Sequence, residues 1–201
     1  VVGATGVVGQ EIISILEERN FPVDKLLPLA SERSAGSKID FHDQRVKVEV
    51  LTKDSFEGID YALFSAGGSI SAEYAPHAVK SGAVVIDNTS HFRMDKDVPL
   101  IVPEVNAHAI KDHKGIIANP NCSTAQLVVA LKPLHDAAQI ERVVISTYQS
   151  VSGAGKDAIL ELEKQSRGSL AGHPTQPEVF PTEIAFNAIP QIDVFQENGY
   201  T

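Results

Sequence analysis

The chain has one cysteine, Cys122, in the run Asn-Pro-Asn-Cys-Ser-Thr at residues 119–124. A thiolate is both a strong nucleophile and a good leaving group, as covalent chemistry on an acyl group requires. The preceding residues are typical of a strand and the following ones of a helix, whose first N–H groups favour a thiolate. A free cysteine is equally often a small buried apolar residue. We treat Cys122 as a candidate nucleophile and Asn121 as an orienting residue or a turn cap.

A glycine-rich loop lies between the first apolar residues and a helical pattern. Its glycines have the spacing G-x-x-G-x-x-G, which allows a tight turn and lets backbone N–H groups approach a pyrophosphate at a helix N-terminus. The alternative is a tight turn with close helix–strand packing and no ligand. The candidate cofactor-binding residues of this loop are Gly3, Thr5, Gly6, Val7, Val8 and Gly9.

A polar turn after the second predicted strand carries Ser31, Arg33 and Ser34. A site for NAD usually has an acidic residue here, whereas arginine and hydroxyl groups suit the 2′-phosphate of NADP. A charge-assisted hydrogen bond contributes roughly 1.5–3 kcal/mol, which is enough to set a preference. We expect Glu32 to point to solvent. The turn predicts NADP as cofactor, and the alternative is a solvated turn without a ligand.

The elements that would position these residues alternate along the first two thirds of the chain. Apolar spacing predicts helices over residues 10–19, 71–81, 106–111, 122–138 and 156–167. Strands are predicted over residues 1–2, 25–30, 45–50, 59–65, 83–86, 115–118 and 140–150. Strand followed by helix, repeated, indicates an α/β fold with a doubly wound parallel sheet of Rossmann type. We predict a nucleotide-binding domain over residues 1–121 and the start of a second domain over residues 122–201.

Composition excludes several classes of function. The 201 residues include 17 basic and 26 acidic side chains, for a net charge of −9, so binding to nucleic acid is not expected. The apolar runs are far shorter than the ~18 residues of a membrane-spanning helix. One cysteine and seven histidines without paired spacing predict neither disulfides nor a metal site. No signal peptide is visible, and the pattern at both ends leads us to expect a piece of a longer protein.

Four motifs occur in one order along the chain: the glycine loop, Ser-Glu-Arg-Ser-Ala-Gly at 31–36, Asn-Thr-Ser-His-Phe-Arg at 88–93, and the cysteine motif at 119–124. Together they resemble the aspartate-β-semialdehyde dehydrogenases, and the cysteine motif is close to diagnostic. The resemblance runs along essentially all 201 residues and ends before the family's C-terminus. It implies that the second domain is the first part of an α+β domain for catalysis and dimerisation.

The resemblance implies a reaction. NADPH would reduce L-aspartyl 4-phosphate to L-aspartate 4-semialdehyde and phosphate, reversibly, in lysine, threonine, methionine and diaminopimelate biosynthesis. Cys122 would attack the acyl phosphate and expel phosphate, and the thioester would then accept hydride. Backbone N–H groups near Cys122 are candidates for stabilising the oxyanion.

The resemblance also implies roles for residues that their own pattern would not single out. Arg93 matches an arginine that holds the phosphate, consistent with planar bidentate pairing. Gln149 matches a glutamine that contacts the substrate near the cysteine. Asn88 is an orienting residue or a turn cap. The residues implied to lie along the cofactor are Ser65, Ala66, Gly67, Ser152 and Gly153.

Two groups of the family's site are expected beyond Thr201: a histidine that exchanges protons with the cysteine, and an arginine for the substrate carboxylate. We therefore expect the 201 residues alone to bind cofactor and to turn over poorly. The resemblance also implies a cytoplasmic homodimer or homotetramer acting on a small molecule. Two alternatives are an N-acetylglutamyl-phosphate reductase and a non-catalytic dinucleotide-binding module without a reactive thiol.

Overall fold

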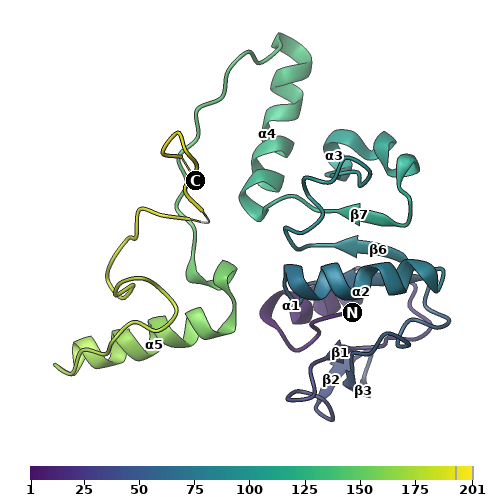
Figure 1. The fold of residues 1–201 in the computed structure, drawn as a ribbon, viewed down its shortest axis with the longest axis horizontal. Coiled ribbons are helices and arrows are strands. Elements are labelled where there is room, and N and C mark those ends of the chain that lie inside the picture. Colours follow the sequence, from purple (N-terminus) through teal and green to yellow (C-terminus); the bar gives the residue numbers. More distant parts are fainter. Residues whose placement is uncertain (193, 201) are drawn as a thin grey trace. The chain divides into compact units, whose positions relative to one another are not determined.

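The structure is a computed structural model that describes residues 1–192 and 194–200. It divides into two compact units, the first over Val1–Thr147 and the second beginning at Tyr148. Figure 1 shows the strands gathered in the first unit and one long helix, α5 (Lys156–Leu170), in the second. This division and the predicted domain boundary at residues 121/122 lie at different places, and the boundary stays a prediction.

A parallel sheet forms the centre of the first unit. Val2 is bridged to Leu29 on one side and to Phe64 on the other, so the first residues of the chain lie in the middle of the sheet. Starting at the β4 edge, its strands are β4 (Glu49–Val50), β1 (Leu29–Ala30), Val2, β5 (Tyr61–Phe64), β6 (Val84–Asp87) and β7 (Ile116–Ala118), whose Ala118 is also bridged to Leu100. Numbered along the chain this order is 3-2-1-4-5-6, the doubly wound arrangement, which confirms the predicted fold class.

Helices connect the strands of this sheet, and one more helix, α4 (Cys122–Ala138), follows its last strand β7. The connecting helices are α1 (Val7–Glu18), α2 (Gly68–Lys80) and the short α3 (Pro103–Asn106) with a 3₁₀ helix over Ala107–Asp112. The side chain of Ile13 from α1 packs in a buried cluster with Ala4 and Phe41. The alanines of α2 at positions 75 and 78 pack in another cluster with Phe64 and Val85. These small residues let α2 approach the sheet closely.

Two predicted strands differ from the structure. The segment predicted as one strand over residues 45–50 divides at Val48 into β3 (Gln44–Lys47) and β4. β3 forms an antiparallel hairpin with β2 (Lys38–Phe41), which the sequence reading missed, whereas β4 joins the parallel sheet. At Val48 the chain changes from pairing with one strand to pairing with another. Period-two alternation of apolar residues indicates which side chains are buried, but it does not indicate which strand is the partner. Only the last two residues of the predicted strand 25–30 pair, as β1.

Residues 140–150, predicted as a long strand, contain no regular secondary structure, so this prediction is wrong. Their β-branched residues favour extended backbone, but a strand also needs a neighbour to accept its hydrogen bonds. No strand in the described part of the chain pairs with this segment, and Val144 is 79% exposed. In the second unit a 3₁₀ helix (Val151–Ala154) precedes α5, which confirms the predicted helix there.

Candidate functional site

The carboxyl ends of the central strands meet at one edge of the sheet. Phe64, Asp87 and Ala118 are paired across β5, β6 and β7, so the residues that follow each of them leave the sheet together. The backbone N–H of Asn88 donates to the carbonyl oxygen of Phe64 at 2.9 Å, and that of Asn119 to the carbonyl oxygen of Asp87 at 2.8 Å. Doubly wound sheets bind their ligands at this edge.

The glycine loop follows Val2 at the same edge, beside the start of the 65–67 segment. Gly3 has a φ of +84°, and a Cβ at this position would lie 2.6 Å from the carbonyl oxygen of Ser65. A Cβ on Gly9 would collide with the carbonyl oxygen of Gly3. Within the described residues, no side chain caps the N-terminus of α1. The first turn of α1 therefore presents backbone N–H groups, as a pyrophosphate site requires.

The surroundings of the other residues predicted to contact the cofactor neither require nor exclude that role. Val7 and Val8, in the first turn of α1, are each 40% exposed. The backbone carbonyl of Thr5 accepts a hydrogen bond from Gln10 at 3.2 Å. Gly67 precedes α2 and has a φ of +97°, which favours glycine there. Ala66 is exposed beside it. Their contacts to a cofactor stay predictions.

The polar turn predicted to read the 2′-phosphate directly follows β1. The carbonyl oxygen of Ser31 accepts hydrogen bonds from the N–H groups of Ser34, at 2.9 Å, and Ala35, at 3.1 Å. This tight turn leaves Arg33 exposed and Ser34 half-buried, and Glu32 is exposed as well. Because β1 lies next to Val2 in the sheet, the turn and the glycine loop leave neighbouring strands.

Arg93 joins the ends of two strands. Its Nε donates to the carbonyl oxygen of Asn119 at 2.8 Å, and its Nη2 donates to that of Asn88 at 3.1 Å. These bonds use two of the five N–H groups of the guanidinium, and they fix the plane of the group. A phosphate would therefore meet the Nη1 and Nη2 edge rather than the Nε side. The predicted phosphate contact stays a prediction.

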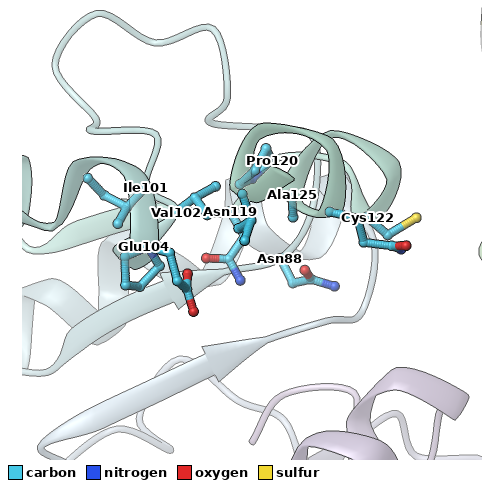
Figure 2. A pocket seen from close by; sticks show the side chains of 11 residues that line it. Asn88, Ile101, Val102, Glu104, Asn119, Pro120, Cys122 and Ala125 are labelled. Atoms are coloured by element: carbon cyan, nitrogen blue, oxygen red, sulfur yellow. The ribbon is translucent and has the colours of Figure 1, made fainter. Parts of the chain in front are cut away.

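Cys122 is the first residue of α4, and its side chain is exposed. The Asn121 side chain caps the helix by accepting a hydrogen bond from the N–H of Ser123 at 2.9 Å. Cys122 lines a pocket of about 610 Å³ together with Asn88 and Asn119. Glu104, which the sequence reading did not single out, lies across the pocket, with Asn88 and Asn119 between it and Cys122 in the view of Figure 2. The pocket thus joins the thiol to the two residues whose carbonyls hold Arg93.

The remaining predicted site residues belong to the second unit. Gln149 is exposed in a segment without regular secondary structure. Ser152 lies in the short 3₁₀ helix before α5, with its hydroxyl 2.7 Å from that of Ser150. Around a Cβ placed on Gly153, no heavy atom of the described residues lies within 4 Å, so the backbone there is open to approach. The proposed roles of these three residues stay predictions.

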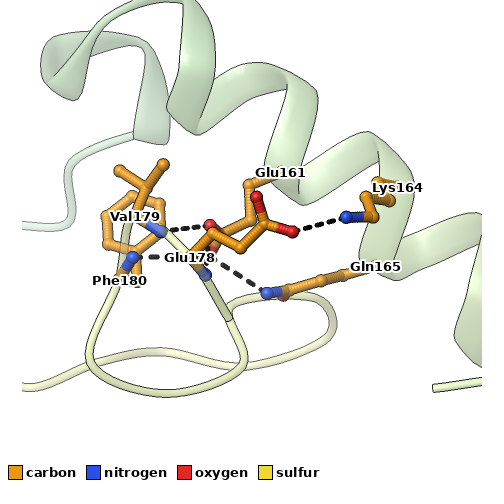
Figure 3. Close-up of polar contacts among 6 residues, drawn as sticks. All are labelled: Glu161, Lys164, Gln165, Glu178, Val179 and Phe180. Atoms are coloured by element: carbon orange, nitrogen blue, oxygen red, sulfur yellow. Dashed lines mark hydrogen bonds and ion pairs between the residues drawn. The ribbon is translucent and has the colours of Figure 1, made fainter. Parts of the chain in front are cut away.

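A buried acidic group in the second unit organises a loop. Glu161 of α5 is 6% exposed, and its carboxylate accepts hydrogen bonds from the backbone N–H groups of Glu178, Val179 and Phe180 (Figure 3). Burial raises the pKa of Glu161, but these donors and the Gln165 amide outweigh burial and hold the pKa below its ordinary value of 4.5. Gln165, also buried, accepts from the N–H groups that follow further along the chain, at residues 184 and 185.

The buried residues Ser71, Asp87 and Thr89 form another polar cluster, at the end of β6. The sequence reading missed it. The only feature of the sequence that could have indicated the cluster is Asp87, an acidic residue at the end of an apolar strand. Alternation along that strand places the Asp87 side chain in the protein interior. Among residues 1–192 and 194–200, no three His, Cys, Asp or Glu side chains gather as metal ligands. The same residues contain no helix that is long and apolar enough to cross a membrane.

Family models match two parts of the chain. The model for the NAD binding domain of semialdehyde dehydrogenase matches residues 1–113. The model for the semialdehyde dehydrogenase dimerisation domain matches residues 131–201. The interval between them contains Cys122 and the predicted domain boundary.

Individual proteins match along the whole chain. Aspartate-semialdehyde dehydrogenase of Bacillus subtilis is 55% identical over 208 residues, covering 100% of this chain and 60% of that protein. The crystal structure of aspartate semialdehyde dehydrogenase II from Vibrio cholerae complexed with ASA superposes with a TM-score of 0.96 at 54% identity, covering 100% and 60% of the two chains. The aspartate semialdehyde dehydrogenase of Candida albicans with NADP gives a TM-score of 0.57 at 30% identity, over 69% and 46%. The chain thus spans about 60% of the length of the curated relatives.

Proposed function

Because the chain belongs to the semialdehyde dehydrogenase family, we propose that the whole protein containing it reduces L-aspartyl 4-phosphate to L-aspartate 4-semialdehyde. The observation that carries the proposal is Cys122 at the first position of α4, exposed and lining the pocket beside the strand ends that Arg93 joins. An acyl phosphate needs a nucleophile, a group for the leaving phosphate and a nearby cofactor. Cys122 and Arg93 would serve as the first two, and the glycine loop would hold the cofactor.

In the proposed reaction the Cys122 thiolate attacks the acyl carbon, and the bond from that carbon to the phosphate oxygen breaks. Arg93 binds the departing phosphate through its outer edge, while Asn121 keeps the first turn of α4 in place. NADPH, when bound, supplies a hydride to the thioester carbonyl. The resulting oxyanion accepts hydrogen bonds from backbone N–H groups near Cys122, and its collapse releases the aldehyde and the thiolate. Gln149 would contact the substrate.

The residues of the first unit fit NADP. A Cβ on Gly3 or Gly9 would collide with the backbone of Ser65 or Gly3, so these glycines allow the tight loop that leads into α1. The first turn of α1 presents N–H groups to a pyrophosphate. Arg33, with the hydroxyls of Ser31 and Ser34, would hold the 2′-phosphate. The segment 65–67 and, in the second unit, Ser152 and Gly153 would lie along the rest of the cofactor.

We place the proposed domains at residues 1–121 and 122–201. The match of residues 131–201 to a dimerisation domain supports a homodimer or homotetramer. Such an enzyme would work in the cytoplasm, in the synthesis of lysine, threonine, methionine and diaminopimelate. An N-acetylglutamyl-phosphate reductase is not favoured, because the similar proteins along the whole chain are aspartate-semialdehyde dehydrogenases.

The test uses the whole protein and follows NADP reduction with L-aspartate 4-semialdehyde, with and without inorganic phosphate. We expect phosphate-dependent turnover that falls at least about 1,000-fold in Cys122→Ala. Thr124→Ala, an exposed change in the same helical turn, is the matched control and should retain activity. Mild alkylation of Cys122, with and without NADP, should show a reactive thiol.

Other outcomes would reject the proposal. Full activity of Cys122→Ala would show that Cys122 is not the nucleophile. Turnover with N-acetylglutamate semialdehyde in place of aspartate semialdehyde would indicate the reductase. NADP binding without turnover or a reactive thiol would indicate the non-catalytic module.

A further inference from the structure

Asp87 is a fully buried acidic residue at the end of β6, and the proposed reaction gives it no role. Its Oδ1 accepts hydrogen bonds from the hydroxyl of Ser71 at 2.8 Å and the backbone N–H of Thr89 at 3.0 Å. Its Oδ2 accepts from the hydroxyl of Thr89 at 2.8 Å. Ser71 and Thr89 are also buried. A polar cluster in the interior costs free energy unless its groups are paired, and these three pair with one another.

The cluster fixes the backbone on both sides of the strand end. Ser71 lies in the first turn of α2, directly after the segment 65–67. Thr89 begins the turn that leads from Asn88 to Arg93, and its hydroxyl oxygen also accepts the N–H of His91 at 3.3 Å. One carboxyl group therefore holds a helix start and a loop start against the sheet.

The loop from Asn88 to Arg93 is anchored at its other end by Arg93 itself. The guanidinium binds the carbonyl oxygens of Asn88 and Asn119, which belong to the residues directly after β6 and β7. The direction of the Asn88 carbonyl depends on how the chain turns at Thr89, the next residue. A change in the backbone at Thr89 would therefore move the Asn88 carbonyl oxygen. That oxygen accepts the hydrogen bond from Nη2 that orients the outer edge of the Arg93 guanidinium.

We propose that Asp87, acting through Thr89 and Ser71, is a positioning residue that sets Arg93 for an inorganic phosphate or phosphoryl group. This inference rests on the proposed function, in which Arg93 binds the leaving phosphate. The side chains of the cluster are buried, so they would act on the phosphate through the backbone that Arg93 binds. The effect of the cluster is selective: it changes the affinity for phosphate while leaving the glycine loop and the thiol unchanged.

The test compares Thr89→Val with Thr89→Ser in the whole protein. Valine keeps the shape and removes the hydroxyl, whereas serine keeps the hydroxyl. Thr52→Val makes the same change in an exposed turn, where the Thr52 hydroxyl lies 3.0 Å from that of Ser55, and it is the matched control. Binding of inorganic phosphate is measured by ³¹P NMR and binding of NADP by calorimetry, so neither readout requires turnover.

We expect Thr89→Val to weaken phosphate binding about five- to tenfold and to change NADP binding less than twofold. Thr89→Ser and Thr52→Val should match the unchanged protein. In an Arg93→Ala background the effect of Thr89→Val should disappear, since the two residues act on one contact. If Thr89→Val does not fold, Thr89→Ala, which removes the same hydroxyl, takes its place in the same comparison.

Three results would overturn the inference: phosphate binding that Thr89→Val leaves unchanged, equal weakening of phosphate and NADP binding, or additive effects of Thr89→Val and Arg93→Ala. Absence of phosphate binding by the unchanged protein would overturn it as well. A protein that shows the selective effect and yet does not turn over aspartate semialdehyde would reject the proposed function and support the positioning role.

Discussion

Each compact unit buries a carboxyl group that accepts hydrogen bonds from the backbone. The two carboxyl groups differ in how far along the chain their backbone donors lie. Asp87 in the first unit binds the N–H of Thr89, two residues away, at the end of a sheet strand. Glu161 in the second unit binds N–H groups 17 to 19 residues away, in a loop that runs past α5. Both are nearly or fully buried.

The difference follows from what surrounds each group. In the first unit Asp87 lies at the end of a strand that is paired on both sides in the parallel sheet, so its carboxyl group needs to fix only the turn that follows. The described loop after α5 has no sheet to pair with, so side chains of the helix must accept its N–H groups. Glu161 and Gln165, one helical turn apart, do this at two successive places. We expect the first unit to tolerate change less than the second.

The largest expected contrast concerns the glycines. Gly9→Ala would bring a Cβ against the Gly3 carbonyl and force α1 away from the sheet, at an expected loss of about 3–5 kcal/mol in the free energy of unfolding. Gly153→Ala, its counterpart in the second unit, meets open space and should change the same quantity by less than about 0.5 kcal/mol. Urea unfolding of the whole protein measures both. Equal losses would contradict the contrast.

Removal of the buried carboxyl group in the first unit should have a smaller effect. Asp87→Ala leaves the buried donors of Ser71 and Thr89 unpaired, and we expect a loss of about 2–3 kcal/mol. Asp97→Ala is the matched control, because Asp97 pairs with Lys114 at the surface and its change should be barely measurable. Thermal unfolding distinguishes them. A loss for Asp87→Ala as small as that for Asp97→Ala would show that water replaces the carboxyl group.

The smallest effect is expected in the second unit and depends on pH. Since hydrogen bonds hold the pKa of Glu161 below its ordinary value of 4.5, its carboxylate stabilises the loop at pH values above 4.5. This stabilisation is lost as the pH falls from 4.5 through the lowered pKa. The amide NMR signal of Val179 should therefore shift only below pH 4.5, and Glu161→Gln should abolish the shift.

A control separates this buried contact from the exposed pair beside it. Lys164 and Glu178 form an ion pair at 2.6 Å with both side chains more than half exposed, and this pair raises the pKa of Lys164. Lys164→Met should leave the titration of the Val179 signal in place, because exposed ion pairs contribute little. A Val179 signal that shifts above pH 4.5, or equally in Glu161→Gln, would contradict the assignment.

Patterns within a few neighbouring residues were sufficient to predict much of the secondary structure of the first unit. The helix at residues 122–138 has the predicted bounds, because an asparagine cap and a following apolar run are neighbours in sequence. The glycine loop follows Val2 and leads into α1, as its spacing predicted, but α1 begins at Val7 rather than at residue 10 and so includes Gly9. Where the deciding partner was distant, the prediction failed, as it did for residues 140–150 and for the β2–β3 hairpin.

The sequence by itself determined the alternation of strands and helices, the glycines that a tight loop requires, and a cysteine at a helix start. Each depends on residues within a few positions of one another. Only the tertiary structure decided that the Arg93 guanidinium spans the ends of β6 and β7, and that Asp87 binds Ser71 of α2. Those contacts join residues 16 and 26 positions apart. Which residues so far apart in sequence come into contact depends on the register of the strands. That register is established only when the whole sheet assembles.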